Sequence, residues 1–251
     1  MKRTLLILIA SLLTVTLYAA PVDEWAAEGD ASYRQGNYAE AIDSYSRVLE
    51  EGYASAELYY NLGNAYYRTG QMGQAILNYE RALRINPSMS DAKENLALAN
   101  SHTVDRITVL PKFFVVRWVD TLCTEVSPRV WRVIVVVLLA LLAVCFVAFR
   151  LGRVLSIRKA SLIVGIVLLV FLLLSALLLL HSTRHYNAHS EAIVMSQAIP
   201  VKGSPEGQSV DKLILHEGTK VTVSDSLASW YKITIADGTT GWCSVNDIER
   251  I

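Results

Sequence analysis

Cysteine is scarce in this sequence, and its three copies form no pattern typical of a metal site or a disulfide scaffold. Cys145 lies inside an apolar run, whereas Cys123 and Cys243 are about 120 residues apart. No CxxC pair and no Cys/His spacing typical of a metal site is present. We therefore interpret all three as small apolar residues, with a Cys123–Cys243 disulfide as the less favoured alternative.

A net charge is also absent, because 23 Lys and Arg residues balance 23 Asp and Glu residues. A nucleic-acid-binding protein would carry a basic face, so we expect no nucleic-acid partner. Residues 21–102 are nevertheless acidic, with 12 Asp and Glu against 6 Lys and Arg. Such a surface could select a basic partner, although a solvated surface is the simpler interpretation.

Motifs that carry catalysis are missing as well. The sequence has no phosphate-binding loop, no Ser/His/Asp arrangement near a plausible cleft and no specific metal motif. Its long apolar runs, residues 133–149 and 160–180, lack the buried acid or base that a transporter needs. We therefore expect that the protein is not an enzyme and that it uses no cofactor or metal.

Hydrophobic residues are abundant, at 53% of the chain, and they concentrate in three runs. The first run follows Lys2 and Arg3 and ends in small residues, which is the layout of a secretory signal. We predict a signal peptide over residues 1–20, cleaved near Ala19 or Ala20, with an uncleaved anchor as the alternative. In either case the segment that follows is expected to be exported.

The other two runs predict a transmembrane hairpin. As helices, their 17 and 21 residues would rise about 25 and 31 Å, enough to cross a hydrocarbon layer of about 30 Å. Neither run, at 133–149 or 160–180, shows the polar stripe of a helix in a soluble core. Residues 150–159 would then form the short loop between two spans.

Positive charge predicts the orientation of this hairpin. The basic residues at the loop are Arg150, Arg153, Arg158 and Lys159. By the positive-inside rule they make the loop cytoplasmic, although Arg129 and Arg132 on the outer flank dilute the signal. We therefore predict a membrane hairpin with a cytoplasmic loop and both polar domains on the outer side of the membrane.

Residues 21–102 contain an internal repeat with an offset of 34 residues, in which residues 31–49 align with residues 65–83. The two units lie near residues 22–55 and 56–89, and each is typical of a helix, a glycine turn and a second helix. Residues 90–102 are expected to form a capping helix. The pattern resembles the tetratricopeptide repeat (TPR) family.

The resemblance implies two classes of residue. Small and aromatic residues would pack the paired helices together: Gly29, Gly63, Ala41, Ala75, Tyr45 and Tyr79. Residues on the first helix of each unit would line a partner-binding groove: Asp30, Tyr33, Arg34, Tyr60, Asn64, Tyr67 and Arg68. The alternative is that the repeats act only as a rigid spacer.

Some TPR proteins bind a terminal carboxylate through Lys, Asn and Arg residues. Asn61, Asn64 and Asn95 fit part of that set, but the expected Lys positions hold Ala26 and Tyr60. The resemblance therefore implies a general peptide or protein groove.

Residues 103–132 connect the repeats to the first span, and the sequence leaves their role open. As a helix, this segment could place Phe113, Phe114 and Trp118 on the bilayer surface, or it could pack under the repeats. Trp131 fits an interfacial anchor.

The sequence also leaves open the role of a row of histidines in the linker 181–191. His181, His185 and His189 would share a helix face, where such residues can bind a metal or sense pH. The favoured interpretation is the polar flank of a span.

Residues 192–251 change to an apolar period of two. Five short strands separated by turn residues predict a small all-β barrel. The Glu217–Gly218 turn, the Trp230–Tyr231 pair and Gly241–Trp242 resemble the bacterial SH3-like family. That resemblance implies a ligand surface at Trp230 and Tyr231 and a peptide or protein ligand, with Cys243 expected in the core.

The predicted fold class is thus a multi-domain membrane protein with an all-α TPR array, a transmembrane helical hairpin and a small all-β SH3-like barrel. This order, with the motifs LPKFF, EAIVM and LHEGTKVTV, resembles the BatE family of the Bacteroides aerotolerance operon. The family is thought to join von Willebrand-factor-A membrane proteins and an AAA+ ATPase of the MoxR type in an envelope complex linked to oxidative-stress tolerance.

Two functions remain open at this stage. The first is a membrane-anchored, extracytoplasmic scaffold that binds protein partners through the TPR groove. The second is an envelope module that binds peptidoglycan through its SH3-like domain, with the TPR array as a spacer.

Overall fold

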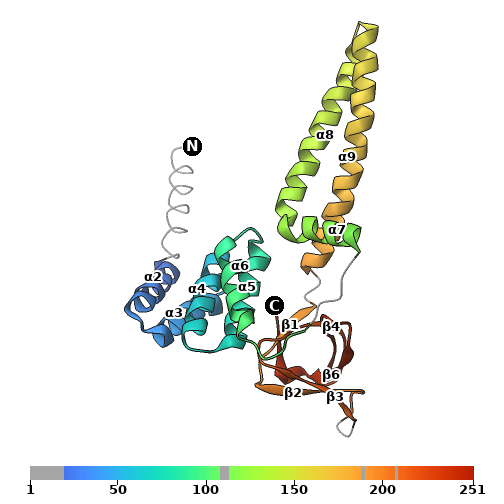
Figure 1. Cartoon of the computed structure of the whole chain (residues 1–251). Coiled ribbons are helices and arrows are strands. Elements are labelled where there is room, and N and C mark those ends of the chain that lie inside the picture. Colours follow the sequence, from blue (N-terminus) through green and yellow to red (C-terminus); the bar gives the residue numbers. More distant parts are fainter. Residues whose placement is uncertain (1–19, 108–112, 188–189, 207–208) are drawn as a thin grey trace, which may run out of the picture. The chain divides into compact units, whose positions relative to one another are not determined.

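The chain forms two compact units in the computed structural model, which describes residues 20–107, 113–187, 190–206 and 209–251 (Figure 1). The first unit combines the described residues up to Ile85 with residues 89–107 and the C-terminal strands. The second holds the two long apolar helices. The first unit is therefore made of segments that lie far apart in the sequence. The predicted signal peptide lies outside the described residues, except for Ala20.

Five helices open the first unit: α2 (Ala20–Gln35), α3 (Tyr38–Glu50), α4 (Ala56–Arg68), α5 (Met72–Ile85) and α6 (Ser90–Ser101). Gly36 and Gly70 end the first helix of each repeat with φ of 85° and 80°, a left-handed conformation that glycine adopts without strain. The Ser55 hydroxyl accepts a hydrogen bond from the Leu58 N–H at 3.0 Å and caps α4. Both repeats therefore have the expected helix, glycine turn and helix.

Close approach of the paired helices depends on two glycines. A Cβ at Gly63 would lie 2.8 Å from the Tyr79 ring, and one at Gly29 would lie 2.5 Å from the Tyr45 ring. Tyr45 and Tyr79 are among the largest fully buried side chains of the described chain. The aromatic rings thus fill the space that the missing side chains leave, which supports the packing role of these residues.

The C-terminal part of the first unit is one antiparallel sheet. Its strands are β1 (Glu191–Val194), β2 (Ala198–Lys202), β3 (Asp211–His216), β4 (Lys220–Leu227), β5 (Trp230–Thr234), β6 (Thr240–Ser244) and β7 (Ile248–Arg250). Their order is β3-β2-β6-β5-β4-β1-β7. Figure 1 shows the strands curving around a common centre, but no pairing between described residues joins β3 to β7. The predicted barrel is therefore not closed, and β1 and β7 are additional to the five predicted strands.

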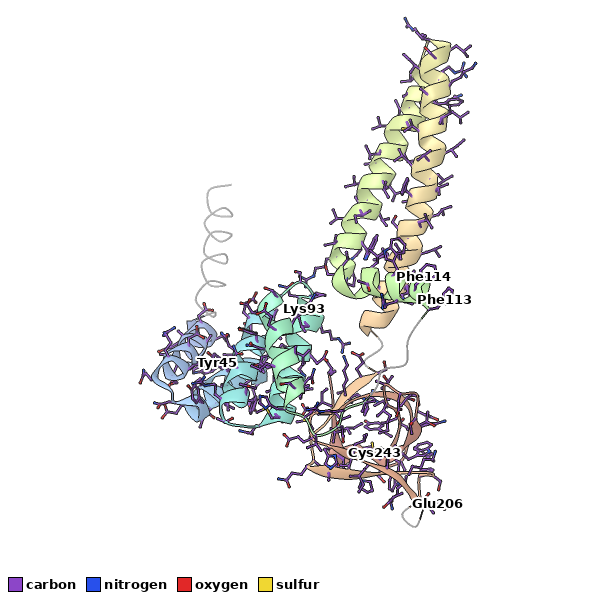
Figure 2. All side chains as sticks on the ribbon, in the orientation of Figure 1. Tyr45, Lys93, Phe113, Phe114, Glu206 and Cys243 are labelled. Atoms are coloured by element: carbon purple, nitrogen blue, oxygen red, sulfur yellow. The ribbon has the colours of Figure 1, made fainter. Side chains whose placement is uncertain are left out.

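Inward-facing residues of the curved sheet form its core, which includes Ile199, Val221 and Ile233. Cys243 lies in this core on β6 (Figure 2), where it is fully buried with a free thiol. Burial raises the pKa of this thiol to about 12, so it stays protonated and unreactive. The Cys123–Cys243 disulfide is not formed.

The sheet packs directly on the second repeat, through an apolar contact that the sequence did not reveal. Ile76 and Leu77 of α5 share one buried cluster with Ile193 of β1 and with Ile251. A Cβ on Gly218 would lie 2.9 Å from the Ile76 side chain, so the β3–β4 turn also approaches α5 closely. The repeats and the sheet consequently share a core.

Polar groups complete this contact. The Glu217 carboxylate accepts a hydrogen bond from the Gly73 N–H at 2.8 Å, so the β3–β4 turn caps the start of α5. Lys220 forms ion pairs at 3.0 Å with Glu80 of α5 and Glu191 of β1. The ion pairs of Lys220 join a helix and two strands.

Asp105, which follows α6, joins the same turn. Its carboxylate accepts hydrogen bonds from the His216 N–H and the Thr219 hydroxyl, both at 2.7 Å, and lies 2.7 Å from His216 Nδ1. Burial alone would raise the pKa of Asp105, but these hydrogen bonds outweigh burial and lower the pKa.

The second unit contains α7 (Phe114–Glu125), α8 (Pro128–Leu151) and α9 (Leu155–Asn187). Figure 1 shows α8 and α9 side by side as a hairpin. Both are long and apolar enough to cross a membrane. Gly165 of α9 faces Cys145 of α8, because a Cβ there would lie 3.9 Å from the Cys145 Cβ.

Both apolar helices extend beyond the predicted spans. α9 continues through His181 and His185 to Asn187, while His189 lies outside the described residues. No group of three residues able to hold a metal ion occurs among the described residues.

Gly63→Val should destabilise the first unit, because its side chain would overlap the Tyr79 ring and the helices would have to separate. We expect the free energy of unfolding of the full chain in detergent to fall by about 2–3 kcal/mol. Circular dichroism during urea unfolding measures this change. Ala97→Val, at an exposed site of α6, is the matched control, with an expected effect of about 0.5 kcal/mol. Equal effects would contradict the packing role of Gly63.

Asp105→Asn should make unfolding less sensitive to acid. A carboxylate with a lowered pKa stabilises the fold above its unfolded pKa of about 3.9, and this contribution disappears as the pH falls through the folded-state pKa. The variant should be less stable than the wild type by about 1–3 kcal/mol at neutral pH. Urea unfolding in a series of acidic buffers should show the difference narrowing. Asp211→Asn, at an exposed site, should change neither the stability at neutral pH nor its dependence on pH. A deficit independent of pH would contradict the assigned role.

Candidate functional site

The seven predicted groove residues lie on the first helices of the two repeats. Asp30, Tyr33 and Arg34 belong to α2, and the other four belong to α4. These helices contact each other, and α4 also contacts α6. One face of the array is thus built from α2, α4 and α6, as the repeat pattern implies.

A hollow of about 210 Å³ lies on this face. It is lined by Asp30, Tyr33, Arg34, Tyr45, Asn61 and Asn64. Four of the seven predicted residues are therefore brought together. Arg34 is exposed, whereas Asp30 is half-buried beside it. The hollow thus presents a cation, an anion, two amides and two phenol rings within one small volume.

Internal hydrogen bonds hold the acid of the hollow in place. The Asp30 carboxylate accepts one from the Tyr45 hydroxyl at 2.6 Å and one from Asn61 Nδ2 at 3.3 Å. Burial raises the pKa of Tyr45, and the hydrogen bond to Asp30 raises it further. The tyrosine therefore stays protonated and donates its proton to the carboxylate. The position of Asp30 is fixed before any ligand binds.

Asn64 belongs to a second network at the same face. Its Oδ1 accepts hydrogen bonds from the Tyr79 hydroxyl and from Asn95 Nδ2, both at 2.8 Å. Asn95 Nδ2 also lies 3.2 Å from the Tyr60 hydroxyl. These contacts join α4 to α5 and α6. Asn64 and Tyr60 therefore help to hold the array together as well as to line its face.

Tyr67 and Arg68 do not line the hollow. The Tyr67 hydroxyl lies 3.2 Å from Nε2 of His102, at the end of α6. The Arg68 guanidinium donates to the Tyr38 hydroxyl at 2.8 and 3.1 Å and lies 5.1 Å from the centre of the Tyr38 ring. The Tyr38 ring packs edge-on against Tyr33 at 5.2 Å. Arg68 thus supports a wall of the hollow through two aromatic rings.

Comparison with known families bears on this part of the chain. A tetratricopeptide repeat model matches residues 26–90. No curated protein matches the chain. The match contains all six residues that line the hollow. The helical array is therefore TPR-like, and TPR domains generally mediate contacts between proteins.

The face built from α2, α4 and α6 is called the TPR face below. Three of its contributors were missed in the sequence or were given other roles. Tyr45 was assigned to packing alone, and Asn61 to an incomplete carboxylate-binding set. Tyr38 received no role, because it starts the second helix of its repeat and lies outside the family's groove pattern. Only its tertiary contacts with Arg68 and Tyr33 show what it does.

The aromatic pair of the sheet lies apart from the TPR face. Trp230 and Tyr231 are both half-buried on β5, and Tyr231 packs against the sheet core. Lys202 Nζ lies 5.8 Å from the centre of the Trp230 ring, and the Arg250 guanidinium lies 4.8 Å from that of Tyr231. Each ring therefore already has a cation over it.

Proposed function

We propose that this protein is a membrane-anchored scaffold that holds a segment of a partner protein in its TPR groove. The observation that carries the proposal is the hollow on the face of α2 and α4. Its polar groups converge from three helices, and Asp30 is fixed there by Tyr45 and Asn61. Because the site is formed in advance, binding a peptide requires little ordering of the protein.

The chemistry of the hollow suits a polar side chain of an extended peptide. Asp30 offers an acceptor and Arg34 offers donors, while the ring of Tyr33 supplies apolar contact. This combination selects by hydrogen bonding more than by net charge. A rigid spacer would have no use for a preformed polar hollow, which favours the binding role over the spacer alternative.

Anchoring is the second part of the proposal. The two apolar helices interrupt the first unit, whose repeats and sheet pack together. An even number of spans returns the chain to the side from which it left, so both parts of the unit can meet. We place the hairpin in a bacterial inner membrane, as the resemblance to the BatE family implies. The basic residues around the loop favour a cytoplasmic loop and a periplasmic first unit.

The resemblance to the BatE family gives this scaffold a biological setting. We propose that its partners are von Willebrand-factor-A membrane proteins of an envelope complex that supports oxidative-stress tolerance. The sheet, read as an SH3-like domain, carries the competing function of peptidoglycan binding at Trp230 and Tyr231. Under both functions the protein binds and positions other molecules and performs no catalysis.

A photoreactive phenylalanine analogue placed at Tyr33 tests the groove. In native membranes of the full-length protein, we expect a discrete crosslinked adduct from Tyr33. Tyr53, an exposed tyrosine in the turn between the repeats, is the matched position and should give none. Arg34→Ala should lower the adduct yield several-fold, because it removes the exposed donor of the hollow. Arg47→Ala, whose side chain pairs with Asp43 on α3, should leave the yield unchanged.

An adduct yield that Arg34→Ala leaves unchanged would contradict partner binding in the groove. Sedimentation with purified peptidoglycan tests the competing function in the same preparation. Retention that disappears in Trp230→Ala would favour that function.

Reporter fusions test the orientation. Alkaline phosphatase joined by a flexible linker after Ile251 should be active, because the enzyme folds only after export. The same reporter inserted after Gly152, between α8 and α9, should be inactive. The opposite pair of activities would reverse the orientation, and two active fusions would contradict the hairpin.

A further inference from the structure

Helix α7 turns aromatic rings away from its own unit. Phe113, Phe114 and Trp118 are 70%, 70% and 66% exposed, and the rings of the first two lie 5.0 Å apart (Figure 2). Amphipathic helices of soluble proteins place such rings inward. In this segment the rings instead face outward, so they need an apolar environment outside the unit.

The exposed residues follow the period of a helix. Phe114, Arg117, Trp118 and Thr121 are three and four positions apart, so they share one face, and all four are exposed. Val119 and Leu122 are half-buried, and α7 contacts α9. α7 therefore uses one side to pack against the hairpin and leaves its aromatic side uncovered.

The uncovered surface continues onto the hairpin. Val130 and Val133, at the start of α8, are 48% and 61% exposed. Side chains of α8 from Ile134 to Phe149 are apolar, and no part of its most hydrophobic window is buried. The exposed apolar surface of α8 therefore begins next to α7 and needs the same kind of cover. Trp131, interpreted from the sequence as an interfacial anchor, is only 9% exposed and packs inside the unit.

We propose that α7 lies along the membrane surface, with Phe113, Phe114 and Trp118 inserted among the lipids at the level of the head groups. This inference rests on the proposed membrane hairpin. Tryptophan and phenylalanine are favoured at that depth, because they combine a large apolar surface with tolerance of the polar boundary. Arg117, between the rings, can extend its guanidinium to lipid phosphates.

Such a helix does more than anchor. Lipid around two spans leaves them free to tilt and rotate, whereas a helix lying flat on the surface and packed on α9 limits both motions. The lipid-facing α7 would therefore set the depth of the hairpin in the membrane.

Spin labels on the full-length protein test this surface. In a background of Cys123→Ser, Cys145→Ala and Cys243→Ala, single cysteines at Phe114 and Trp118 receive a nitroxide, so that two of the three rings remain in each variant. The protein is placed in vesicles of phosphatidylethanolamine and phosphatidylglycerol. Collision rates with oxygen, which enters lipid, and with a water-soluble nickel chelate are then compared.

Labels at Phe114 and Trp118 should show a several-fold higher ratio of oxygen to nickel collisions than a label at Tyr53 of the first unit. Labels at Val136 of α8 and Leu173 of α9 report on the spans themselves. If these two report lipid while the α7 labels report water, the inference is overturned and the hairpin stands. If all four report water, the proposed hairpin fails as well.

Contact with protein gives a different signature. A second copy of the chain, or another protein surface, would protect the α7 labels from both oxygen and nickel. That result also overturns the inference. Dilution of the protein in the vesicles distinguishes the two cases, because only contact with a second copy would be lost.

Discussion

The docking of the C-terminal sheet on helix α5 is the contact on which the rest of the molecule depends. Ile193 and Ile251 share a core with Ile76 and Leu77, and the β3–β4 turn caps α5 through Glu217. This contact makes one unit from two segments separated by both apolar helices. Any membrane arrangement must keep the two segments on the same side, which the hairpin permits.

Rigidity at the TPR face has a related origin. The buried rings of Tyr45 and Tyr79 fill space beside glycines, while their hydroxyls reach Asp30 and Asn64 on the exposed face. Each tyrosine therefore connects the packing of a helix pair to a polar group at the surface. Packing and binding are not separate sets of residues here, because the same side chains serve both.

Local patterns in the sequence predicted the parts of this fold that repeat or that extend over many residues. The offset of 34 residues predicted the helix pairs, and two long uncharged runs predicted the hairpin helices. Strands β1 and β7 have four and three residues and are too short for a clear period. The docking contact joins Gly73 to Glu217 across 144 positions, and no local pattern carries such information. At the hollow, four of six lining residues were predicted, and Tyr45 and Asn61 emerged from tertiary hydrogen bonds.

Discontinuity of the first unit also sets an order of events during synthesis. The repeats leave the ribosome before the hairpin, and the strands that cover Ile76 and Leu77 follow the hairpin. Until then these side chains are not covered by the sheet, and the start of α5 lacks its cap from Glu217. Arg84, which donates a hydrogen bond to the backbone oxygen of Ile251, would meet its acceptor only after both apolar helices have been made. The packing of α5 is thereby completed only after both apolar helices and the strands that follow them have been made.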